Sequence, residues 1–130
     1  MAIFKGSGVA IVTPMKENLD VDFDKLEELI NFQIDNGTDA IIIAGTTGES
    51  STLTMEEHRR VIQAAVEFTK HRVPVVAGTG SNCTRTAIHL TKEAEEDGAD
   101  AALIVTPYYT KATQKGQIAH YGEIGSETKV

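Results

Sequence analysis

The amino-acid sequence predicts an α/β fold in which a parallel sheet is built from four strand–helix units. Short apolar runs alternate four times with longer segments whose apolar residues recur at helical spacing. The expected strands lie near residues 10, 42, 75 and 103. Spacings of about 30 residues are typical of strand–helix units joined by right-handed crossovers. Such alternation favours a parallel sheet covered by helices.

The first unit has clear boundaries. The apolar run Val9–Val12 is expected to form a strand that stops at Thr13-Pro14. A helix is expected over Asp22–Asp35, because its apolar residues fall on one face. Asn36-Gly37 is a typical helix stop.

In the second unit, the expected strand Ala40–Ala44 is continuously apolar, as a strand buried on both faces should be. A helix is expected to start at Thr54, because Glu57 three residues later completes a capping box. The basic residues at positions 70–72 suit the negative pole at the end of this helix.

The third unit combines a strand over Val73–Ala77 with a helix that Ser81 or Asn82 is expected to cap. Asp97-Gly98 is expected to end that helix.

The fourth unit combines a strand over Ala101–Val105 with a helix from Thr113 to about Ile124, which two internal glycines weaken. Four units amount to half of a (βα)8 barrel, which typically has about 250 residues. A single domain over residues 1–130 is expected, and two arrangements of it are open: half of such a barrel, or an open doubly wound sheet.

Composition narrows the class of protein. The chain is 41% apolar and 24% charged, as in soluble globular proteins. A formal net charge of −7 without a basic cluster argues against binding to nucleic acid or anionic membranes. The apolar stretches are too short to span a bilayer. The single cysteine, Cys83, allows no internal disulfide, which favours a reducing cytoplasm.

The segment AGTTGESSTL, residues 44–53, is the strongest candidate for a binding loop, because ligands of parallel α/β folds lie at the carboxyl ends of strands. Gly45 and Gly48 permit a tight turn whose N–H groups can face an anion. Thr46, Thr47 and Ser50 add hydroxyl donors. The loop matches neither nucleotide-binding glycine motif, so a carboxylate or a small phosphate fits best. A polar connecting loop without a ligand is the alternative.

Other chemistry-bearing residues are less specific. The tyrosines of TPYY, residues 106–109, can relay a proton or form an aromatic packing pair. Glu49 is expected to buttress its turn rather than act as a base, and Cys83 has no histidine placed near it as a base. The four histidines show no metal-ligand spacing, so we expect solvated or packing roles, no metal ion and no other cofactor.

Four motifs together carry a resemblance: GVAIVTPM, GTTGESSTL, PVVAGTGSN and VTPYY. In this order and spacing, through about Tyr121, the sequence resembles the dihydrodipicolinate synthase family, within the wider superfamily of pyruvate-dependent lyases. The resemblance implies a (βα)8 barrel that condenses pyruvate with aspartate semialdehyde through a lysine Schiff base, on the route to lysine.

The resemblance also implies roles for residues. Thr47 matches the threonine that binds the pyruvate carboxylate, helped by neighbouring backbone N–H groups such as that of Gly48. Thr46 matches the threonine of a proton relay. Tyr109 matches a tyrosine that a neighbouring subunit inserts into that relay, so a dimeric or tetrameric homo-oligomer is expected.

The Schiff-base lysine of the family lies on strand six, so we expect it to be absent from these 130 residues and the chain to be inactive or very weak alone. Lys111 is the lysine nearest the functional face, but its solvated loop position makes it a poor substitute nucleophile. Thr110 departs from the asparagine usual in the family, which affects local loop geometry. A non-catalytic half-barrel that self-associates and binds at most a small carboxylate is the alternative.

Lysine-inhibited members of the family bind free lysine at a subunit interface. The matching positions here are Ser50, Ser51, Met55, His58, Asn82, Thr86 and Tyr108. Met55 and Thr86 replace a histidine and a glutamate. Because a missing carboxylate partner for the effector's ammonium should weaken binding, we expect insensitivity to lysine, even in a full-length version.

Overall fold

The computed structural model describes residues 2–130 and contains four strand–helix units. Their bounds are β1 Gly8–Ala10, α1 Phe23–Asp35, β2 Ala40–Ile43, α2 Met55–Thr69, β3 Val75–Gly78, α3 Thr84–Glu96, β4 Ala101–Leu103 and α4 Gln114–Glu127. The predicted α/β alternation is confirmed. None of the helices in the described part of the chain is both long and apolar enough to cross a membrane.

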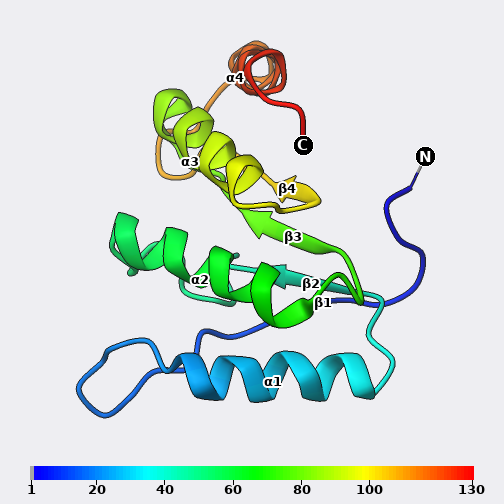
Figure 1. Cartoon of the computed structure of the whole chain (residues 1–130). Helices are drawn as coiled ribbons and strands as arrows, with labels where there is room; N and C mark the ends of the chain where they lie inside the picture. Colours follow the sequence, from blue (N-terminus) through cyan, green and yellow to red (C-terminus); the bar gives the residue numbers. More distant parts are fainter. Residues whose placement is uncertain (1) are drawn as a thin grey trace.

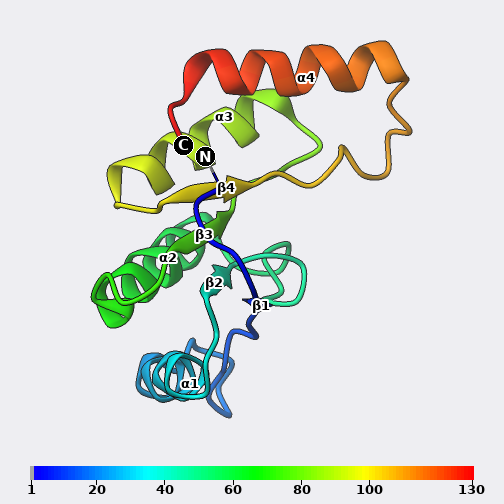
Figure 2. The ribbon, with the colours of Figure 1, turned by 90° about the vertical axis from the view of Figure 1, so that its right-hand side faces the viewer.

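The four strands form one parallel sheet in the order β1-β2-β3-β4. The helices follow one another from α1 to α4 in the same order (Figures 1 and 2). In a doubly wound sheet the strand order reverses at a switch point. The sequential order shows that the open doubly wound alternative is wrong and that the units are arranged as in a barrel.

The outer face of the sheet packs against helices. Ile41 pairs with Val75, and Ile43 pairs with Ala77, and all four side chains are buried. Helices α1 and α2 contribute further buried residues to this core, namely Leu26, Ile30, Val61 and Ile62. Burial of this kind, at roughly 25 cal/mol per Å² of apolar surface, is the main stabilising contribution to the fold.

The inner face of the sheet is apolar but open. Leu103 at the end of β4 is 48% exposed and Val105 just beyond it is 42% exposed. Val12, which follows β1, is 52% exposed. At the other end of this face the ring of Phe4 lies beside Gly8, where a Cβ atom would clash with it. The half-barrel therefore presents an uncovered hydrophobic surface.

Predicted element ends differ from the observed ones by a few residues, most informatively at β2. Ala44 was expected in this strand, but its φ of 53° is left-handed, so the chain turns there. The other strands begin or end within two residues of their predicted bounds. Such shifts are ordinary for strand ends.

Two helix ends were predicted wrongly because long-range contacts decide them. Cys83, rather than Ser81 or Asn82, occupies the N-cap of α3. The Ser81 hydroxyl accepts a hydrogen bond from the Cys83 N–H at 3.2 Å, whereas the Asn82 amide donates to the Tyr108 carbonyl at 3.3 Å. Helix α4 continues to Glu127 rather than about Ile124, where Glu127 pairs with Lys92 of α3 at 2.7 Å.

Candidate functional site

The carboxyl ends of β2, β3 and β4 meet closely, and two glycines allow it. A Cβ atom on Gly78 would overlap the carbonyl group of Ala44. A Cβ atom on Gly80 would overlap the backbone nitrogen of Val105. The glycines of the AGTGSN motif are therefore needed to bring three strand-end loops into one site.

The loop after β2 is a tight turn bracketed by two strained residues. Ala44 and Glu49 both have left-handed φ angles, 53° and 57°, which cost about 1 kcal/mol or more each in a residue other than glycine. Within the turn the Glu49 N–H donates to the Thr46 carbonyl at 3.0 Å and the Ser50 N–H donates to the Gly45 carbonyl at 3.3 Å. Glu49 thus buttresses the turn through its backbone.

The turn is also held by the segment that follows β1. The buried hydroxyl of Thr13 donates to the Gly48 carbonyl at 2.7 Å. Within residues 2–130, the N–H groups of Thr46, Thr47 and Gly48 donate to no protein acceptor. Gly48 is buried, whereas Thr46 and Thr47 are exposed. Unpaired N–H groups at a buried position are rare in proteins, so this loop is suited to an acceptor from outside the chain.

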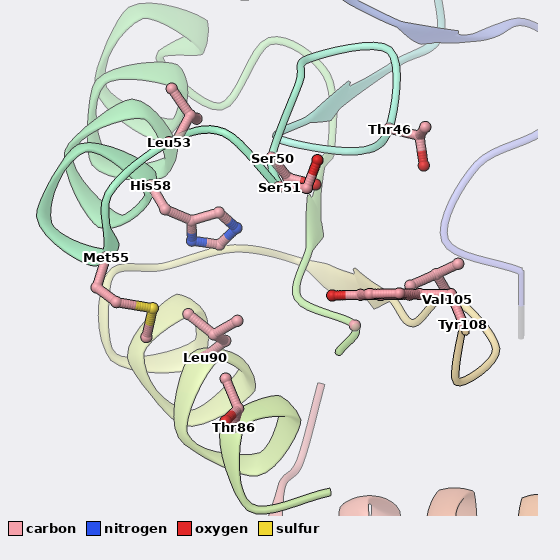
Figure 3. A pocket seen from close by; sticks show the side chains of 11 residues that line it. Thr46, Ser50, Ser51, Leu53, Met55, His58, Thr86, Leu90, Val105 and Tyr108 are labelled. Atoms are coloured by element: carbon pink, nitrogen blue, oxygen red, sulfur yellow. The ribbon is translucent and has the colours of Figure 1, made fainter. Parts of the chain in front are cut away.

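A cavity of about 410 Å³ lies between this loop, α2, α3 and the segment after β4. Its lining residues are Thr46, Ser50, Ser51, Leu53, Met55, His58, Gly80, Thr86, Leu90, Val105 and Tyr108. In Figure 3, Met55 and His58 of α2 face Thr86 and Leu90 of α3, and the Tyr108 hydroxyl reaches toward the space between them. Of the predicted effector positions, Asn82 alone does not line the cavity.

His58 is the polar anchor of this cavity. Its Nε2 lies 2.8 Å from the Gly78 carbonyl, so Nε2 carries the proton and donates. Burial lowers the pKa of His58, and the ring is therefore neutral at neutral pH. A solvated role is wrong for this histidine, which is only 5% exposed. The lining residues carry no charged side chain, so the cavity offers hydroxyl groups, the neutral His58 ring and apolar side chains.

The two tyrosines after β4 point to different surroundings. Tyr108 lines the cavity, whereas Tyr109 is 96% exposed with a left-handed φ of 69°. They are therefore not a buried aromatic packing pair. Lys111, also left-handed at 50°, is exposed in the same loop. Sequence reasoning could not place this turn, because the segment carries no glycine to mark the left-handed positions.

Cys83 is exposed at the start of α3. A hydrogen bond with the Thr86 side chain lowers the pKa of its thiol. Within residues 2–130 the thiol has no histidine partner, so the structure offers no base for a nucleophilic role.

Comparison with known proteins gives a consistent result. The model of the "Dihydrodipicolinate synthetase family" matches residues 3–130. A 4-hydroxy-tetrahydrodipicolinate synthase of Lachnoclostridium phytofermentans is 70% identical over 124 residues, which cover 95% of this chain and 42% of that protein. The chain thus spans less than half the length of the curated relatives it matches.

Solved structures agree with this fold. A chloride-inhibited dihydrodipicolinate synthase from Acinetobacter baumannii, complexed with pyruvate, superposes with a TM-score of 0.97 at 51% identity, covering 99% of this chain and 44% of that one. A dihydrodipicolinate synthase from Cyanidioschyzon merolae, with lysine bound, superposes with a TM-score of 0.94 at 40% identity, covering 98% of this chain and 43% of that one. By sequence and by fold, the chain belongs to the dihydrodipicolinate synthetase family.

Proposed function

We propose that the chain supplies the carboxylate-binding part of a dihydrodipicolinate synthase, which condenses pyruvate with aspartate semialdehyde through a lysine Schiff base in lysine biosynthesis. Family membership supports the reaction. The single observation that carries the role of this chain is the loop after β2, in which the N–H groups of Thr46, Thr47 and Gly48 donate to no acceptor within residues 2–130 and can therefore bind a carboxylate. The related Acinetobacter baumannii enzyme is described in complex with pyruvate.

The pyruvate carboxylate is bound by the Thr47 hydroxyl together with these N–H groups. A carboxylate accepts several hydrogen bonds from such donors. The Thr46 hydroxyl, on the same turn and at the wall of the cavity, belongs to a proton relay. A chain of hydroxyl groups moves protons without placing a full charge in a dry site.

Tyr109 completes the relay of a neighbouring copy. Its side chain is 96% exposed and held outward by a left-handed backbone, which suits insertion into another subunit. The working form is therefore a homo-oligomer, a dimer or a tetramer. With no disulfide and a free thiol at Cys83, a reducing cytoplasm is the compartment that fits.

These 130 residues alone have little or no synthase activity. A Schiff base forms when a neutral amine attacks the pyruvate ketone and water leaves, so the lysine must be desolvated to lower its pKa. All eight lysines are exposed, at positions 5, 16, 25, 70, 92, 111, 115 and 129. None of them therefore meets this requirement within the described chain.

Two measurements on the 130-residue protein test the proposal. Pyruvate should shift the amide NMR signals of Thr46, Thr47 and Gly48, and Thr47→Val should weaken that binding. Intact mass after incubation with pyruvate and borohydride should show no reduced adduct. Unshifted amides would refute the carboxylate site. A stoichiometric adduct would refute the inactivity, and Lys111 would be the first lysine to replace.

A non-catalytic scaffold that self-associates is the second candidate function. The observation that favours it is the uncovered inner face with Val12, Leu103 and Val105, together with the open edges of β1 and β4. Exposed edges and apolar patches of this kind promote association. The two candidates differ in pyruvate binding by specific amides, which a scaffold does not require.

A further inference from the structure

Thr13 lies outside the loop after β2 but makes the contact that fixes its shape. It follows β1 and is only 5% exposed. Its hydroxyl donates to the Gly48 carbonyl across 35 positions of sequence, at 2.7 Å. The contact joins the first two strand–helix units at the carboxyl ends of their strands, which is where ligand sites of such folds lie.

The Gly48–Glu49 peptide is the point at which the turn could change shape. Its oxygen accepts from Thr13, and its N–H, on the opposite side of the same peptide, donates to the Thr46 carbonyl at 3.0 Å. A flip of this peptide would exchange oxygen and N–H, set the Gly48 oxygen against the Thr46 oxygen, and open the turn. Glycine at position 48 makes such rotation easier than any other residue would.

We propose that Thr13 is a positioning residue for the bound carboxylate: its buried hydroxyl locks the Gly48–Glu49 peptide and so keeps the free N–H groups of residues 46–48 arranged for an anion. This inference rests on the proposed function and adds a residue of β1's loop to the site. Because Ala44 and Glu49 are strained, the turn is expected to change conformation when the Thr13 hydrogen bond is removed.

Packing around Gly48 supports the lock. A Cβ atom on Gly48 would lie 3.2 Å from the Thr13 hydroxyl and 3.3 Å from the Ala44 backbone. The glycine is therefore packed closely between Thr13 and Ala44, the first residue of the turn.

The test compares Thr13→Val, which keeps the shape and removes the donor, with Thr13→Ser, which keeps the donor. In Thr13→Val we expect the dissociation constant for pyruvate, read from the amide signals of residues 46–48, to rise about tenfold or more, since a buried acceptor loses its partner. In Thr13→Ser it should stay near that of the unaltered protein.

Thr79→Val is the matched control. Thr79 is also a fully buried threonine after a strand, and its hydroxyl bonds Thr91 at 2.8 Å rather than the loop. It should lose stability without losing pyruvate affinity. Equal losses of pyruvate affinity in Thr13→Val and Thr79→Val would show that Thr13 acts only through stability, which would overturn the inference.

A ligand-free readout separates this inference from the proposed function. Hydrogen exchange of the Glu49 N–H should quicken in Thr13→Val and not in Thr79→Val or Thr13→Ser. If pyruvate shifts no amide in the unaltered protein, the carboxylate site is refuted, and with it the carboxylate role of Thr13. If pyruvate binds but exchange and affinity are unchanged in Thr13→Val, the Thr13 lock alone is refuted.

Discussion

At the scale of the residue, the absence of one methyl group at Gly78 allows the loop after β2 to reach β3. Gly122 is the contrasting case: a Cβ atom there would meet nothing within 4 Å, although it lies in the middle of α4. The same substitution at these two glycines should therefore have opposite signs.

We expect Gly78→Ala to lower the free energy of unfolding by about 1–3 kcal/mol, because the new Cβ would overlap backbone atoms that cannot rotate away. Gly122→Ala should raise it by about 0.5–1 kcal/mol through better helix propensity. Urea denaturation of both variants checks this. A destabilised Gly122→Ala would show that the helix needs flexibility at that position.

Met55 and Thr86 set the chemistry of the cavity, which they line without adding a charge. Free lysine at millimolar concentration should therefore leave the His58 imidazole NMR signals unmoved. The pair Met55→His and Thr86→Glu should introduce lysine binding, since the ammonium gains a carboxylate partner. Saturable shifts of the His58 signals in the unaltered protein would contradict the prediction.

At the scale of the element, polar contacts join each helix to the next. Arg72, in the turn after α2, donates to Asn31 of α1 at 2.5 Å. Arg59 of α2 donates two hydrogen bonds, 2.8 and 3.0 Å long, to the carboxylate of Asp97, which follows α3. It also forms an ion pair with Glu93. Such partly exposed pairs add little stability each, but they fix how neighbouring helices sit over the sheet.

The start of α2 gives a pH-dependent prediction. Thr54 and Glu57 form the capping box, and the backbone hydrogen bond from Thr54 lowers the pKa of the Glu57 carboxyl. Because the pKa of this carboxyl is lower in the folded state, the ionised carboxylate stabilises the fold above the unfolded pKa of about 4.3. That stabilisation is lost as the pH falls through the folded value. The difference in unfolding free energy between the unaltered protein and Glu57→Gln should shrink from about pH 6 to about pH 3. A constant difference across that range would contradict it.

The capping box also shows what local sequence can predict. Its two residues are three positions apart, so their contact follows from spacing, as do the strand–helix alternation and the turn with Thr46 and Thr47. The lock between Thr13 and Gly48 depends on how two units pack. The N-cap at Cys83 depends on where Asn82 finds its partner, and that partner is after the next strand. Spacing cannot supply such contacts. Gly45 signals a turn, but it does not show that the left-handed residue is Ala44 rather than the glycine beside it.

At the scale of the whole molecule, one face of the sheet is covered and the other is not (Figure 2). The covered face carries the core, and the open face lies inside the arc of the half-barrel. Because this surface is apolar, its most favourable state is one in which something packs against it.

We expect the 130-residue protein to associate, with a mass by light scattering that rises with concentration. Leu103→Glu on the inner face should reduce this association. Ile118→Glu is the matched control, because Ile118 is 71% exposed on α4, away from the sheet. A protein that stays monomeric, or equal effects of both variants, would show that the inner face is not the contact surface.

The sequential strand order has a further consequence for how the chain acquires its structure. Each strand pairs only with the strand before it or after it in the chain. No strand therefore needs a partner that is synthesised more than one strand–helix unit later. During synthesis, β2 can pair with β1 once residues 40–43 have followed α1 out, and each new unit can then extend that sheet. Stepwise addition of units in this way means that each strand closes a loop of only one strand–helix unit before it pairs.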